Sequence, residues 1–272
     1  MMTVDERISR ASSAQGEELW KYVRDPVSEV VLNVVLNRKF SEEMAIYLAK
    51  QKSTRADVLG ILANDVRFKD SYRLKLSICK NPKTPLNISM SLLKYFRLFD
   101  LGDMTKDQNI PINLRQKIEY AITEKIPAMP AGNKIALSKR SSSTIVMALL
   151  ERGDQRVITA CLESPLISEG HLCKAVNRRR TKPMIIRLIS EHPKWSLRYT
   201  VRYALIRNYH TPMTRITSFL KDMKTIDLKD LYEDRSLPLS TKPFIYRELL
   251  DRKETTTVDV VDTYDISDSE DI

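Results

Sequence analysis

The residues best suited to bind a charged partner lie between Asn177 and Tyr209, where arginine and aromatic side chains recur close together. Guanidinium groups make paired hydrogen bonds to carboxylates and phosphates, and Trp and Tyr rings offer flat surfaces for stacking. A surface of this composition suits an acidic protein segment or the phosphate backbone of a nucleic acid. The candidate binding residues are Arg178, Arg179, Arg180, Lys182, Trp195, Arg198, Tyr199 and Arg202.

The same stretch has a second interpretation based on packing. The helix expected from about Trp195 carries two apolar faces, one of them aromatic, and places Arg198 and Arg202 together at spacing i, i+4. If both faces pack against neighbouring helices, the aromatic rings are buried and the arginine head groups lie at the rim. The pattern by itself does not separate these two alternatives.

No motif in the chain predicts catalysis, cofactor binding or a metal site. His171 and Cys173 are the only close His/Cys pair, and the sequence has no P-loop, G-x-G-x-x-G or G-x-S-x-G motif. The cysteines Cys79, Cys161 and Cys173 are odd in number and widely spaced, which favours a reduced, cytoplasmic location. No apolar run is long enough to span a membrane, and we expect no secretory signal at the N-terminus. We therefore expect a non-enzymatic protein that carries no cofactor.

Charge is unevenly distributed along the chain. The net charge is +10, but residues 254–272 hold seven acidic and no basic side chains, which leaves residues 1–253 at +17 (10 + 7). The segment 254–272 is of low complexity and is expected to be a disordered, solubilising acidic tail. Its apolar residues among acids also suggest a second role, in which the tail docks within the same molecule on the basic surface.

A repeated pattern indicates how the chain folds. The segments Ser71–Phe96 and Arg198–Met223 match at one constant offset, with an apolar helix, a stop at Asn, a Thr-Pro restart and a second apolar helix in each. Asn tolerates the conformation that closes a helix, Thr can cap the next one, and Pro is accepted in a first helical turn. The paired corner residues are Asn81 with Asn208, Thr84 with Thr211 and Pro85 with Pro212.

Helical pairs of this kind are expected along most of the chain. The spacing of Asn37 from Asn81 is 44 residues (81 − 37), so we predict a repeat period in the mid-forties. We expect a flexible N-terminus over 1–16, a single helical repeat domain over 17–253 with a divergent unit at 97–140, and the acidic tail over 254–272. The predicted fold class is all-α.

The second copy resembles the leucine-rich repeat variant and HEAT-like repeats of bacteria. The residues that carry this resemblance are His192, Pro193, Arg198, Val201, Leu205, Asn208, Thr211 and Pro212. The resemblance implies a right-handed α-α superhelix, a solenoid of the HEAT and armadillo type, that is used for binding. Some leucine-rich repeat variant proteins carry an N-terminal iron–sulfur segment, but this chain has no Cys before Cys79.

These observations predict a non-enzymatic scaffold that presents a basic groove to a protein partner, and we expect this partner to be acidic. The main alternative is a HEAT-like protein that binds nucleic acid with the same residues. A further alternative is a HEAT-like alkylpurine DNA glycosylase, because Trp195, Arg198 and Tyr199 look broadly similar to the residues of its basic concave face. That activity also needs an Asp, and the nearest downstream ones are Asp222 and Asp227.

Overall fold

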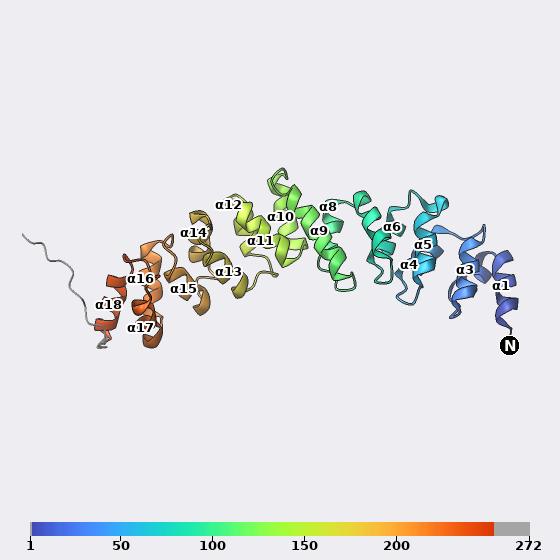
Figure 1. The fold of residues 1–272 in the computed structure, drawn as a ribbon. Helices are drawn as coiled ribbons and strands as arrows, with labels where there is room; N and C mark the ends of the chain where they lie inside the picture. The colour runs from blue at the N-terminus through green and yellow to red at the C-terminus, as the bar shows by residue number, and fades with distance from the viewer. Residues whose placement is uncertain (1, 253–272) are drawn as a thin grey trace, which may run out of the picture. The chain divides into compact units, whose positions relative to one another are not determined.

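The computed structural model describes residues 2–252, and every regular element within them is a helix (Figure 1). No strand occurs in this part of the chain, which confirms the predicted all-helical class. The helices separate into two compact units, one ending at Arg152 and the other starting at Gly153. The predicted acidic tail, 254–272, lies outside the described residues.

Unit 1 contains eleven α-helices, most of them seven to ten residues long. In chain order they are α1 (Val4–Ser13), α2 (Gly16–Val23), α3 (Ser28–Leu36), α4 (Glu42–Lys50), α5 (Ala56–Asn64), α6 (Tyr72–Lys80), α7 (Leu86–Leu92), α8 (Leu98–Met104), α9 (Ile112–Lys125), α10 (Ala131–Arg140) and α11 (Ser143–Arg152).

Unit 2 contains seven α-helices of similar length. They are α12 (Gln155–Leu162), α13 (Glu169–Val176), α14 (Pro183–Glu191), α15 (Tyr199–Ile206), α16 (Met213–Lys221), α17 (Thr225–Glu233) and α18 (Lys242–Asp251).

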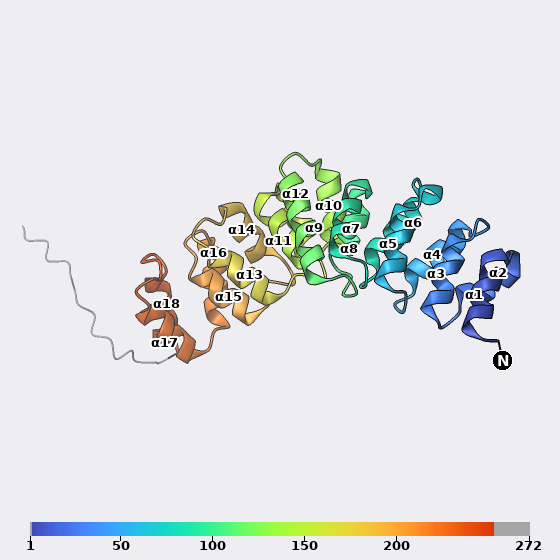
Figure 2. The same ribbon diagram turned by 45° about the vertical axis from the view of Figure 1, so that its right-hand side comes forward.

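Within each unit the strongest contacts join helices that are one or two places apart in the chain. In unit 1, α4 packs on α6 and α3 on α5; in unit 2, α13 packs on α15 and α12 on α14. Figure 2 shows α13 and α15 side by side on one side of unit 2, with α14 and α16 on the other. A chain packed in this local manner has no single centre, and it divides into two compact units. The single repeat domain over 17–253 stays a prediction.

The structure extends the sequence repeat over nearly the whole described chain. Tyr72 starts α6 and Tyr199 starts α15, an offset of 127 residues (199 − 72). At this same offset the starts of α1 to α8 fall on the starts of α10 to α17, one by one. Core positions follow the same rule: Leu74 and Ile78 are buried in α6, as are Val201 and Leu205 in α15. The interval 97–140, expected to be divergent, holds α8, α9 and α10. Of these, α8 and α9 correspond in order to α17 and α18, and α10 corresponds to α1.

The predicted period in the mid-forties is not the number of residues in one helical pair. Corresponding ends of alternate helices lie at Gln51 and Asn81, 30 residues apart (81 − 51), and their second-copy counterparts Arg178 and Asn208 have the same spacing (208 − 178). The interval between Asn37 and Asn81 covers three helices, α4, α5 and α6. The two Asn residues recur because each ends a helix, and not because they are one helical pair apart.

A helix occupies part of the N-terminal segment that the sequence indicated to be flexible. In α1, Thr3 Oγ1 accepts a hydrogen bond from the Glu6 backbone N–H, and the Glu6 carboxylate accepts one from the Thr3 N–H. This capping box satisfies two donors that the first helical turn leaves free. Ala11 is fully buried and α1 packs on α3, so the segment is part of unit 1. The Thr-x-x-Glu spacing is the signal that could have predicted it.

The corners between helices are closed by side chains that bond to helix-end carbonyls. Asn81 Nδ2 donates to the carbonyls of Ala49 and Gln51, both at 2.9 Å, and its Oδ1 accepts from the Lys83 N–H at 3.0 Å. Thr84 Oγ1 donates to the Ile78 carbonyl at 2.5 Å. The last carbonyls of a helix have no donor within the helix. The corner side chains donate to these carbonyls, and Asn81 also ties α6 to the end of α4.

Replacing this side chain tests how much the corner contributes. Asn81→Ala is expected to lower the free energy of unfolding by about 2 kcal/mol, because buried carbonyls lose their donors. Exposed Asn87 on α7 is the matched control, and Asn87→Ala should change stability by less than about 0.5 kcal/mol. Urea denaturation followed by circular dichroism measures both variants. Equal stability of the two variants would contradict a structural role for the corner bonds.

Candidate binding edges

The predicted basic run lies on an exposed connection in unit 2. Arg178, Arg179, Arg180 and Lys182 fill the link between the end of α13 at Val176 and the start of α14, and all four are exposed. Within residues 2–252, Arg179, Arg180 and Lys182 form no salt bridge. Their positive charge is therefore not neutralised by the described chain, and it is available to an acidic partner.

Trp195 is part of the core. Its side chain is only 2% exposed, and its Nε1 donates to the Leu162 carbonyl at 2.9 Å. Beside it, buried His192 accepts a hydrogen bond from the Lys194 N–H, and its Nε2 lies 3.0 Å from a Glu163 carboxylate oxygen. Trp195 therefore packs and closes a corner, as the second interpretation of the sequence expected, and its ring is not exposed for stacking.

Tyr199 joins two helices. Its hydroxyl donates to the Asp227 carboxylate on α17 and accepts from the Lys224 N–H at 3.1 Å. Burial, followed by the hydrogen bond to Asp227, raises the pKa of this phenol above its ordinary value. The first copy has the same joint, in which the Tyr72 hydroxyl bonds to Asp100 and accepts from the Arg97 N–H.

The two arginines at spacing i, i+4 are both paired within unit 2. Arg198 lies 3.5 Å from Glu169, and Arg202, which is largely buried, bonds to Asp222 at 2.8 Å and to the Ser196 carbonyl. Asp222 and Asp227, the carboxylates that the glycosylase alternative would need, are thus engaged by Arg202 and Tyr199. These pairs hold the helices together and leave little free positive charge.

The predicted site residues form two groups at opposite ends of adjacent helices. Arg198 precedes α15 and contacts Glu169 at the start of α13, whereas Asn208 follows α15 and donates to Val176 at the end of α13. An eight-residue helix such as α15 is about 12 Å long, because each residue adds about 1.5 Å. The structure therefore does not bring Arg198, Tyr199 and Arg202 together with Arg178–Arg180.

Residues missed by the sequence analysis lie beside the basic run instead. Tyr209 is 65% exposed and stacks on His210 with 3.9 Å between ring centroids, in the corner that follows α15. Arg207 lies in the same corner and is paired with Asp234 at 2.7 Å. The constant offset between the two copies could have predicted these residues, because it aligns their positions with the corner that follows α6. We call this surface the arginine edge, and its members are Arg178, Arg179, Arg180, Lys182, Arg207, Tyr209 and His210.

An open groove adjoins the arginine edge. It has a volume of about 360 Å³ and lies among α14 and the first residues of α12 and α16. Its apolar lining includes Met184, which is 47% exposed, and Leu188. His210 lines it too, so it reaches the arginine edge. Arg187 and Glu191 in its wall pair with each other at 3.0 Å. The groove can accept an apolar side chain next to free positive charge.

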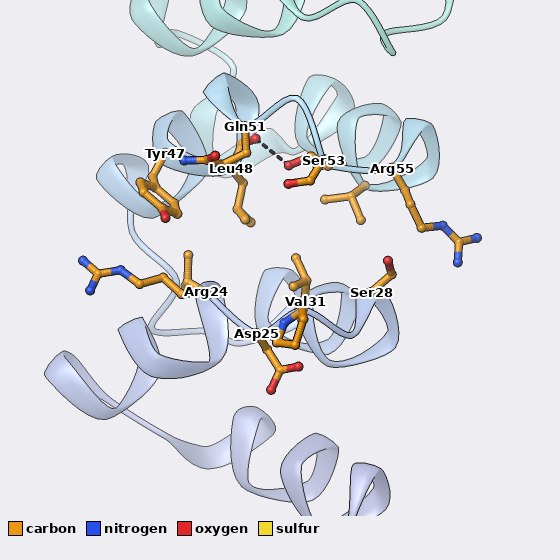
Figure 3. Close-up of a pocket in the computed structure, with 13 residues that line it drawn as sticks. Arg24, Asp25, Ser28, Val31, Tyr47, Leu48, Gln51, Ser53 and Arg55 are labelled. Carbon is orange, nitrogen blue, oxygen red and sulfur yellow. Dashed lines mark hydrogen bonds between the residues drawn. The ribbon is translucent and has the colours of Figure 1, made fainter.

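A second cavity, in unit 1, has charged residues in its walls, and two of them are paired within the chain (Figure 3). Its volume is about 410 Å³, and Val31 and Leu48 face each other across it. Asp25 accepts two hydrogen bonds from Arg7, at 2.8 and 2.6 Å. Arg55 points away from the cavity and pairs with Asp57 at 2.9 Å. Arg24, which also lines the cavity, lies over the rings of Trp20 and Tyr47 and forms no salt bridge within residues 2–252.

Comparisons with protein-family models, curated proteins and solved structures found no match to this chain. The resemblance to bacterial helical repeats therefore stays a prediction. In residues 2–252, no three His, Cys, Asp or Glu side chains are grouped so that they could hold a metal ion. Among the same residues, no helix has the length and apolar character needed to cross a membrane.

The cysteines differ in their expected reactivity. Burial raises the pKa of the Cys79 and Cys161 thiols to about 12. It also raises the pKa of the Cys173 thiol, but that side chain is only half-buried. The thiolate is the reactive form, and at pH 8 a thiol with a pKa of about 12 is ionised in about one molecule in ten thousand. A coloured aromatic disulfide reagent should therefore label Cys173 alone in the native protein, and all three cysteines in urea. Prompt native labelling of a Cys173→Ser variant would contradict the burial of the other two.

Proposed function

We propose that this protein is a non-enzymatic binding scaffold that holds an acidic segment of a protein partner on the arginine edge. The observation that carries the proposal is the unpaired charge of Arg179, Arg180 and Lys182 beside an open groove that is partly lined by apolar side chains. Arginine binds carboxylates through two parallel hydrogen bonds, and apolar contact next to it adds affinity that salt does not screen.

The proposed architecture is a right-handed solenoid of HEAT-like helical pairs within each unit. Its support is the local packing, in which the strongest contacts join helices that are one or two places apart, together with the recurring corners. Such a stack exposes long edges made of successive corners. A binding function suits these edges, because their backbone is held by bonds such as that from Asn208 to Val176.

Nucleic acid is the second candidate partner, and one observation favours it. Tyr209 is 65% exposed and stacked on His210 among arginines, an arrangement that can also stack on a base. The protein partner is preferred because the adjoining groove is lined by Met184, Leu188 and Pro212, which match an apolar side chain better than a phosphate. The glycosylase alternative is not pursued, because Trp195 is buried and cannot contact an extruded base.

The acidic tail is a natural competitor for this surface. Residues 254–272 combine seven acids with apolar residues such as Val260 and Tyr264, the chemistry that the arginine edge would bind. Intramolecular docking of the tail stays a prediction. The proposed scaffold function does not depend on it, because a partner present in excess can displace a tethered segment of lower affinity. A cytoplasmic location is part of the same proposal.

The test uses a fluorescein-labelled peptide in which Glu and Asp alternate with Val and Tyr, and a single-stranded DNA of equal charge. Full-length protein should bind the peptide, and Arg179→Glu with Arg180→Glu should weaken binding by at least about tenfold, because attraction becomes repulsion. The control pair Lys221→Glu with Arg247→Glu changes net charge equally at exposed sites elsewhere and should cost less than about threefold. Fluorescence anisotropy over a salt titration measures each affinity.

The outcomes separate the candidates. Tighter binding to peptide than to DNA, with a shallow salt dependence, supports the protein partner. Tighter binding to DNA that falls steeply with salt supports the nucleic-acid alternative. Equal losses in the test and control pairs would show that only net charge matters, and absence of binding to both probes would overturn the proposal.

A further inference from the structure

The first copy carries a basic surface at the positions that correspond to the arginine edge. At the offset of 127 residues, Lys52 corresponds to Arg179 and Lys80 to Arg207 (179 − 52 and 207 − 80). The two copies differ at most exposed positions, but a cation is kept at both of these. We define the lysine edge as Lys50, Lys52, Lys80 and Lys83, which lie at the ends of α4 and α6 and in the corners that follow them.

Three of these lysines surround one cavity. Lys50, Lys52 and Lys80 line a space of about 290 Å³, together with the apolar side chains of Ala49 and Leu76. Lys52 Nζ donates to Asn109 Oδ1 at 2.6 Å, which holds its ammonium group at the cavity. The cavity lining therefore combines apolar side chains with positively charged ones, as the arginine edge and its groove do in unit 2.

The corner geometry fixes this arrangement. Asn81 bonds the corner after α6 to the end of α4, and Lys83 Nζ donates to the Ser53 carbonyl at 3.2 Å. In unit 2 the corresponding Asn208 bonds the corner after α15 to the end of α13 at 2.6 Å. The lysine and arginine edges are thus built on the same backbone framework, and their cations project from equivalent corners.

The lysine edge has an excess of positive charge. Within residues 2–252, none of its four ammonium groups forms a salt bridge. The carboxylate that lines the cavity, Asp107, accepts hydrogen bonds from Asn109, at 3.0 Å from the backbone N–H and 2.9 Å from Nδ2. With three lysines and one aspartate in its lining, the cavity carries more positive than negative charge. Like charges repel one another, and a bound anion relieves that repulsion.

We propose that the lysine edge is a second docking site for the acidic segment, so that one molecule holds two such segments. This inference rests on the proposed function of the arginine edge. Lysine binds a carboxylate as a point charge and arginine binds it with two parallel hydrogen bonds, so the lysine edge is the weaker of the two sites. A partner with two acidic segments, or a partner dimer, gains avidity from both.

Isothermal titration calorimetry of the full-length protein with the acidic peptide counts the sites. The wild type should bind two peptides. Lys52→Glu with Lys80→Glu should leave one site of unchanged high affinity, and Arg179→Glu with Arg180→Glu should leave one weaker site. Combining all four substitutions should abolish binding. The control Lys117→Glu with Lys125→Glu, at exposed positions of α9, should keep both sites.

An uncharged double variant controls for misfolding. Lys52→Gln with Lys80→Gln removes the charge but keeps a polar, unbranched side chain, and it should weaken the second site by about tenfold, with an unchanged circular dichroism spectrum. This inference is overturned if the wild type has a single site that is lost in Arg179→Glu with Arg180→Glu and is kept in the lysine variants. The proposed function stands in that case. Absence of binding by the wild type overturns the proposed function itself. Two sites that survive both sets of lysine variants would place the second site elsewhere and also overturn the inference.

Discussion

The hydrogen bonds between corner side chains and helix-end carbonyls are the interaction on which the rest of this structure depends. Most of the helices have only seven to ten residues, and isolated helices of that length are not stable in water. Each must be held by its neighbours. Asn81 and Asn208 do this by donating to the last carbonyls of a helix two places earlier, so one side chain both ends its own helix and positions another. Exposed edges with fixed geometry follow from this arrangement.

Comparison of the two copies shows that a corner hydrogen bond can persist when the residue type changes. Asp65 and His192 occupy corresponding corners, and each accepts a hydrogen bond from the backbone N–H two residues later. Hydrogen bonding to Arg67 holds the pKa of the Asp65 carboxyl below its ordinary value. The bond needs an acceptor at a given position, and an aspartate oxygen or an imidazole nitrogen supplies it. Residue type therefore changes between the copies while the corner persists.

Cations that are paired with carboxylates and cations that are not have different roles in this chain. The arginines on α15 and at its two ends, Arg198, Arg202 and Arg207, are paired with carboxylates. Other cations in the connections, such as Arg179 and Lys52, form no salt bridge in the described chain. A paired surface cation contributes little to recognition, because its field is already neutralised. The unpaired cations at the corners are therefore the ones that can select an acidic partner and speed its association.

The sequence by itself determined the helical class, the corner motif and the constant offset, because apolar periodicity and the Asn and Thr-Pro signals are local properties of the chain. It also pointed to the basic run Arg178–Arg180. Only the tertiary structure decided that Trp195 is buried, that Arg198 and Arg202 are paired, and that these residues lie at the far end of the helix from that run. Burial and ion pairing depend on which helix packs beside which, and no local pattern encodes that choice. The acidic partners come from segments 20 or more residues away, as Asp222 does for Arg202 (222 − 202).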